Sequence, residues 1–187
     1  MAWLIAHLII VNTILLYMNS SILFILHMPP PVHGAAMMGK YIHDSNVINE
    51  AFDCHYINLT TARDLTDIGK IGLRKIRQFV NLLNTIRKEV KRLKPQLVYV
   101  TPNARGGAFY KDFIIVQMLK LMKFKVVVHY HNKGVTARQD KVIDNLLYRL
   151  FFRNLKVILL AESLYNDIKK YVSRDNIMIC PNGIPEQ

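Results

Sequence analysis

The sequence has few cysteines, few acidic residues and no glycine-rich nucleotide fingerprint. Its 187 residues include two cysteines, Cys54 and Cys180, whose spacing matches neither a metal site nor a disulfide framework. We therefore expect free thiols, a reducing compartment such as the cytoplasm, and no metal. Asp and Glu number 13 against 25 Lys and Arg, which gives a formal net charge of +12. That excess favours anionic partners, such as phosphate-bearing ligands or an acidic membrane face.

An apolar run without charges opens the chain, from Ala2 to Met18, and the first lysine is Lys40. No basic residue precedes it and no clear small-residue cleavage site follows, which argues against a signal peptide. A helix over this run would be about 25 Å long, short of the roughly 30 Å hydrocarbon core of a bilayer. We treat residues 1–19 as a separate segment with three open interpretations. It is an extension upstream of a true start at Met18, an anchor at the inner membrane face, or an extra helix packed on the domain.

Strand-like and helix-like segments alternate through residues 20–180, the predicted domain. We expect strands over residues 22–27, 53–58, 96–101, 125–130, 156–161 and 176–180. We expect helices over residues 34–45, 70–94, 108–122, 140–153 and 163–172, the last with Ser163 as N-cap. This alternation predicts an α/β fold with a doubly wound, mostly parallel sheet and helices on both faces. Ligands of such sheets bind beyond the carboxyl ends of the strands.

The helix expected over residues 70–94 has two distinct faces. Its apolar face comprises Ile76, Phe79, Val80, Leu83, Ile86, Val90 and Leu93. Its basic residues, mostly opposite, are Lys70, Arg74, Arg77, Lys88, Lys91 and Arg92. The basic face suits an anionic membrane surface, or it is simply solvated. It has no interleaved aromatic residues, so we expect no nucleic-acid partner.

The first loop to inspect is "HMPPPVHGAAMMG", which follows the first expected strand. Prolines hold it extended, and His33 and Gly34 begin the next helix, whose N-terminus suits an anion. Only Gly34 and Gly39 are available, so the dinucleotide fingerprint is absent, and so is the Walker A lysine. The loop is either a ligand site, with Gly34 allowing close approach to the backbone, or a tight turn with glycine used for packing.

Two later loops carry further candidate residues. In "TPNARGG", Asn103 and Arg105 could reach a ligand at the rim, and arginine suits carboxylate or phosphate groups. In "VVVHYHNKG", His129 and His131 point to the same side of an extended strand, with Tyr130 on the other side. His131 is placed to hydrogen-bond a polar ligand, with a structural role as the alternative. No nucleophile elbow surrounds Ser163.

Three stretches together resemble the N-terminal domain of family 4 glycosyltransferases. They are "ILFILHMPPPVHGAAMMGKYI", "VVVHYHNKG", and "VILLAESLYNDIKKYVSRDNIMICPNGIPEQ" with its closing Pro-Asn-Gly-Ile. The resemblance spans about residues 20–187. It implies one Rossmann-like half of a two-domain GT-B enzyme, the half that binds the acceptor. Gly34 would lie near the donor phosphates or acceptor, His131 would contact the transferred sugar, and Asn182 and Gly183 would begin a hinge over residues 181–187.

The resemblance further implies a retaining transfer of a sugar from a nucleotide-sugar donor to a lipid-linked or polysaccharide acceptor, without a metal or other cofactor. The chain ends at Gln187, where the donor domain of this family would begin, so we expect the chain alone to be inactive. One alternative is a non-catalytic, membrane-associated binding module with the same fold. Another, a nicotinamide-dependent oxidoreductase domain, is disfavoured by the missing glycine fingerprint.

Overall fold

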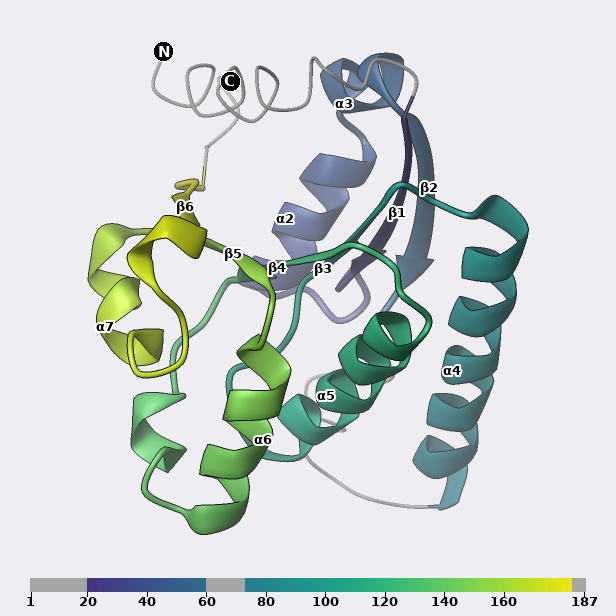
Figure 1. Ribbon diagram of the computed structural model, residues 1–187. Coiled ribbons are helices and arrows are strands. Elements are labelled where there is room, and N and C mark those ends of the chain that lie inside the picture. Colours follow the sequence, from purple (N-terminus) through teal and green to yellow (C-terminus); the bar gives the residue numbers. More distant parts are fainter. Residues whose placement is uncertain (1–19, 60–72, 183–187) are drawn as a thin grey trace.

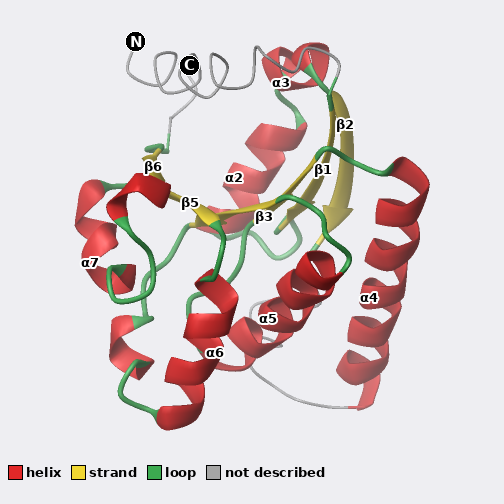
Figure 2. Cartoon of the chain, viewed as in Figure 1, coloured by secondary structure: helices red, strands yellow, loops and turns green. Residues whose placement is uncertain are grey.

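Short apolar runs form the strands of the protein, whose computed structural model describes residues 20–59 and 73–182 (Figures 1 and 2). The strands are β1 (Ser21–Leu26), β2 (Asp53–Asn58), β3 (Leu97–Val100), β4 (Val126–Tyr130), β5 (Lys156–Leu159) and β6 (Ile177–Ile179). The helices are α2 (Gly34–His43), α3 (Asn46–Ala51), α4 (Leu73–Leu93), α5 (Gly106–Leu121), α6 (Val142–Phe152) and α7 (Tyr165–Ile168). Three-residue 3-10 turns lie at Thr136–Arg138, Glu162–Leu164 and Arg174–Asn176.

The six strands form one sheet in the order β2-β1-β3-β4-β5-β6, and every pairing is parallel. The predicted α/β fold with a doubly wound, Rossmann-like sheet is therefore confirmed. The chain leaves β1 toward β2 on one side and returns to β3 on the other. Ligands of open parallel sheets bind at such a reversal, outside the carboxyl ends of the strands. The loops after β1 and β3 flank this point.

Alternate residues of the strands pack on opposite faces of the sheet. Leu23 and Ile25 of β1 belong to the main core, which also contains buried side chains of α4, α5 and α6. Ile22, Phe24 and Leu26 belong to a smaller cluster, to which α2 and α3 contribute. The period of two along β1 thus assigns α4–α6 to one layer and α2 and α3 to the other (Figure 1).

The predicted strands are confirmed to within two residues at each end, but two helical predictions differ from the structure. The additional helix α3 follows α2 because Ser45 caps it, accepting a hydrogen bond from the Ile48 amide at 3.4 Å. The prediction of Ser163 as the N-cap of a helix over 163–172 is wrong. The chain tightens directly after β5, so that Ser163 falls inside a 3-10 turn capped by Ala161, and α7 covers only four residues.

Helix α4 is confirmed, but its apolar face is only partly buried. Ile86 and Val90 are fully buried in the main core, whereas Ile76 is 52% exposed and Val80 is 47% exposed. A helix of 21 residues is about 31 Å long, whereas a six-residue strand spans about 20 Å. The first turns of α4 therefore project past the sheet. The predicted basic residues from Arg74 onward are exposed, whereas Lys70 and the predicted N-terminal segment 1–19 lie outside the described residues.

Candidate functional site

The carboxyl ends of β1 and β3 bring a histidine and an asparagine into contact. His27 directly follows β1, and its backbone amide donates to Thr101 Oγ1 at 3.2 Å. Asn103 lies in the loop after β3, and its Nδ2 donates to His27 Nε2 at 3.2 Å. This bond makes Nε2 an acceptor, so the neutral imidazole carries its proton on Nδ1. A predicted site residue, Asn103, thus lies at the point where the strand order reverses.

Asp112 of α5 holds that asparagine in place. Its Oδ2 accepts hydrogen bonds from the backbone amide and the Nδ2 of Asn103, both at 2.8 Å. The Asp112 side chain is fully buried, and Lys111 Nζ lies 3.2 Å from its Oδ1. The carboxylate therefore orients both the loop and the amide that contacts His27. A sequence signal for this role existed, because Asp112 is the only acidic residue in an otherwise largely apolar helix.

His33, Gly34 and Gly39, which follow β1, have different roles in the structure. His33 caps α2, accepting a hydrogen bond from the Ala36 amide on Nδ1 at 3.3 Å, and its ring centroid lies 6.0 Å from that of His27. Gly39 lies within α2, and a Cβ there would lie 2.0 Å from the backbone oxygen of His27, so Gly39 is the glycine used for packing. A Cβ at Gly34 would meet no atom within 4 Å among the described residues. The space beside the start of α2 is therefore open.

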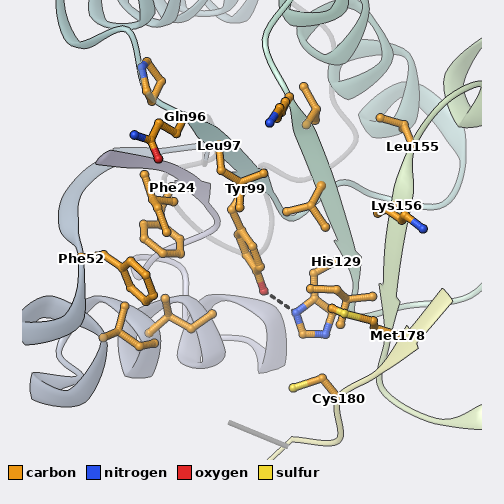
Figure 3. A pocket seen from close by; sticks show the side chains of 18 of the residues that line it. Phe24, Phe52, Gln96, Leu97, Tyr99, His129, Leu155, Lys156, Met178 and Cys180 are labelled. Atoms are coloured by element: carbon orange, nitrogen blue, oxygen red, sulfur yellow. Dashed lines mark hydrogen bonds between the residues drawn. The ribbon is translucent and has the colours of Figure 1, made fainter. Parts of the chain in front are cut away.

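Two neighbouring histidine rings, tilted by 41° to each other, lie at the end of strand β4. The ring centroids of His129 and His131 are 4.2 Å apart, which confirms that they point to the same side, and Tyr130 packs with Phe151 and Phe152 on the opposite side. His129 Nδ1 is hydrogen-bonded to the hydroxyl of Tyr99 on β3 (Figure 3). His129 Nε2 and both ring nitrogens of His131 are buried and have no hydrogen-bond partner among the described residues.

Burial keeps these imidazoles neutral at physiological pH. It lowers the pKa of His27 to about 4, with nearby Asp112 opposing the change, and it lowers the pKa of His131 to about 4 as well. Burial also holds the pKa of His129 well below its usual value, with the neighbouring His131 adding to the effect. Each ring therefore offers one hydrogen-bond donor and one acceptor without charge. Such a set suits uncharged hydroxyl groups better than carboxylates or phosphates.

Arg105 lines a different hollow from the one that contains His129 and His131. Arg105 is the N-cap residue of α5 and makes no capping hydrogen bond through its side chain. Its side chain lies over Gly134, where a Cβ would approach Arg105 Cδ to 2.6 Å, and it lines a second hollow of about 540 Å³. Asp167 lines the same hollow and accepts from the backbone amides of residues 134–136 at 2.8–3.0 Å. The Asp167 carboxylate therefore stabilises the loop after β4.

A larger hollow of about 1050 Å³ contains the β4 histidines. It extends from His129, His131 and Asn182 across one face of the sheet. Asn182, a predicted hinge residue, is exposed at this rim, and Gly183 lies outside the described residues. Sequence reasoning missed Tyr99. This residue pairs in register with Val127, and His129 lies two residues after Val127, so Tyr99 and His129 share a sheet face. His27, Asp112 and Tyr99 thus join the candidate site.

Comparison of the sequence with protein-family models and with curated proteins gave no match. Within residues 20–59 and 73–182, no group of three or more His, Cys, Asp or Glu side chains is placed to hold a metal ion. Cys54 and Cys180 are both free thiols. None of the helices in the described part of the chain is both long and apolar enough to cross a membrane. The functional argument therefore rests on the geometry of His27, His129 and His131.

Proposed function

We propose that this chain is the acceptor-side domain of a glycosyltransferase, which moves a sugar from a nucleotide-sugar donor to a lipid-linked or polysaccharide acceptor with retention. The observation that carries the proposal is His131. Its two ring nitrogens are buried without a partner among the described residues, at the end of a central strand beside a large hollow. A neutral imidazole in that position gains hydrogen bonds when a hydroxyl-rich ligand such as a sugar enters.

Asn103, His27 and the backbone near Gly34 would bind other parts of the ligand. Asn103 and His27 present an amide and a neutral imidazole at the neighbouring strand ends. The open space at Gly34, at the N-terminus of a ten-residue helix, would admit a phosphate of the donor. The transfer breaks the bond between the anomeric carbon and the diphosphate and forms one to an acceptor oxygen. Groups of a second domain would stabilise the departing diphosphate, so we expect binding without turnover from these 187 residues.

The test is an NMR titration of the histidine-labelled chain with UDP-glucose and GDP-mannose. We expect the ring signals of His131 to shift with at least one of them, and His131→Ala to weaken that binding at least tenfold. His43→Ala, at the exposed end of α2, is the matched control and should bind normally. Ring-signal shifts confined to the exposed His43, no shift with either sugar nucleotide, or binding of nicotinamide dinucleotide in place of both, would reject the proposal.

The exposed cations of α4 favour a second candidate function, a membrane-associated binding module. Arg77, Lys88 and Lys91 are exposed, whereas Arg92 is paired with Glu89 at 2.5 Å. Such a surface should bind vesicles that contain phosphatidylglycerol and release them as salt is added. Replacement of Lys88 and Lys91 by glutamate should abolish that binding. Vesicle binding that is equal for this variant and for the unaltered chain would exclude α4 as the membrane surface.

A further inference from the structure

Helix α6 carries apolar side chains on both of its sides. Its inner side packs in the main core through Tyr148, Phe151 and Phe152. Four aliphatic residues of its outer side are exposed, and they are Val142, Ile143, Leu146 and Leu150. Ile143 is 71% exposed and Leu146 is 57% exposed. A helix that is apolar all round is normally covered on all sides, so the outer side of α6 calls for a partner.

The neighbouring helix α5 extends this apolar surface. Ile114 and Leu121 are exposed, and because they are seven residues apart they share one side of the helix. Gln117 lies on the same side between them, and its Nε2 donates to the backbone oxygen of Leu150 at 3.1 Å. This side of α5 therefore borders α6, beside which it lies in Figure 1. We call these exposed residues of α5 and α6 together the α5–α6 patch.

The charged residues beside the α5–α6 patch are cations. Three exposed cations that form no ion pair with a described residue lie in or next to α6, and they are Lys141, Arg149 and Arg153. The acidic residues of the two helices are Asp112 and Asp144, and both are buried. The exposed Asp140 lies before α6, next to one of the cations. An aliphatic surface with this excess of positive charge complements an anionic lipid surface.

The outer face of α4, which lies in the same layer, has a different composition. The exposed residues in the middle of α4 are polar or basic, and they are Asn81, Asn84, Thr85, Arg87 and Lys88. Such residues suit contact with water. The aliphatic outer face of α5 and α6 is therefore a local feature of these two helices and not a property of the whole layer.

We propose that the α5–α6 patch binds an anionic lipid bilayer, with its aliphatic side chains at the boundary between head groups and acyl chains. Helices at membrane interfaces combine aliphatic residues with lysine and arginine in this way. The long side chains of Arg149 and Arg153 would reach the head groups while their stems cover apolar surface. A second copy of the chain fits less well, because a two-fold contact through the patch would bring these cations toward the same cations of the other copy.

The test measures which surface of the full chain contacts lipid. In a chain carrying Cys54→Ser and Cys180→Ser, a bimane fluorophore is attached at Leu146→Cys. Vesicles of phosphatidylglycerol and phosphatidylcholine contain doxyl-labelled lipid, which quenches a fluorophore that enters the bilayer. We expect quenching at Leu146→Cys to exceed that at Val47→Cys by about threefold or more. Val47 is the matched control, because it is 58% exposed and lies on α3 in the opposite layer.

Three outcomes of this measurement would overturn the proposal. They are an absence of quenching at Leu146→Cys, equal quenching at Leu146→Cys and Val47→Cys, and quenching at Thr85→Cys on α4 without quenching at Leu146→Cys. The last result would assign the membrane surface to α4. Because the readout is local to each position, binding of the chain to vesicles through any other segment does not produce the expected pattern.

A second experiment alters the patch itself. With the fluorophore at Ile143→Cys, the added substitution Leu146→Asp should reduce quenching about threefold or more, and so should reversal of Arg149 and Arg153 to glutamate. Val47→Asp should leave quenching unchanged. Equal quenching in vesicles with and without phosphatidylglycerol would contradict the role of the cations. A lipid-free dimer that is lost in Leu146→Asp, as seen by sedimentation, would assign the patch to a second copy instead.

Circular dichroism of each variant checks that the sheet and its helices are retained, which we expect because the altered side chains are exposed. None of these readouts depends on a bound sugar nucleotide, so this proposal and the glycosyltransferase proposal can fail separately.

Discussion

Replacing Gly39 by alanine should destabilise the protein, although alanine is the better helix former. A Cβ at this position would lie 2.0 Å from the backbone oxygen of His27, and real Cβ atoms essentially never lie within 3.0 Å of such an atom. Helix α2 would have to move away from β1 by about 1 Å. Because a backbone oxygen cannot rotate aside as a flexible side chain can, we use the upper end of the range for overpacking, about 3 kcal/mol.

The intrinsic helix preference of alanine offsets about 1 kcal/mol of that loss. The net effect of Gly39→Ala is then a decrease of about 2 kcal/mol in the free energy of unfolding. With a urea dependence of about 2 kcal/mol per molar, the unfolding midpoint should fall by about 1 M. Urea unfolding followed by circular dichroism at 222 nm measures this shift, provided that the transition is two-state.

Gly34→Ala is the matched control, because the same change at the start of the same helix meets no atom within 4 Å among the described residues. It should leave stability unchanged or raise it by up to about 1 kcal/mol, through the lower entropy of the unfolded chain. If Gly39→Ala unfolded at the same urea concentration as the unaltered protein, the close packing of α2 on the end of β1 would be refuted. Equal losses for both variants would refute the assignment of the packing role to Gly39 alone.

Two further predictions concern the buried polar groups. The free energy of unfolding should fall as the pH drops from 6.5 toward 4, since unfolded histidines take up protons that His27 and His131, with pKa values of about 4, do not bind when folded. Each contributes about 1.4 kcal/mol per pH unit in the middle of that range, so His131→Gln should lower the slope by that amount. Asp112→Ala should cost about 3 kcal/mol in urea unfolding, because it leaves Lys111 and the amides of Asn103 without their buried partner.

An unchanged pH slope for His131→Gln would contradict the burial of that ring. The control for the Asp112 experiment is an exposed residue of the same type. Asp140→Ala removes an exposed carboxylate and should alter stability by less than about 0.5 kcal/mol. An equally small effect of Asp112→Ala would show that this carboxylate does not hold the loop after β3.

The sequence by itself determined the order and type of the main elements. Short, mostly apolar runs such as Val126–Tyr130 predicted buried strands, and their alternation with helices predicted a parallel sheet. It also placed His129 and His131 on one side of a strand, because side chains alternate with a period of two. Local geometry of this kind depends only on neighbouring residues and is therefore readable from the chain.

The tertiary structure decided which distant residues meet. Asn103 contacts His27 across 76 positions of sequence, and Arg105, two residues later, turns instead toward Gly134. The pairing of Tyr99 with His129 depends on strand register, and the burial of Asp112 depends on the loop folded over it. Nor could the sequence show that Gly39, rather than Gly34, faces the end of β1 at 2.0 Å. Such contacts follow from the packing of helices on the sheet. Residue periodicity shows which face of an element a side chain lies on, but it does not show which distant residue that side chain contacts.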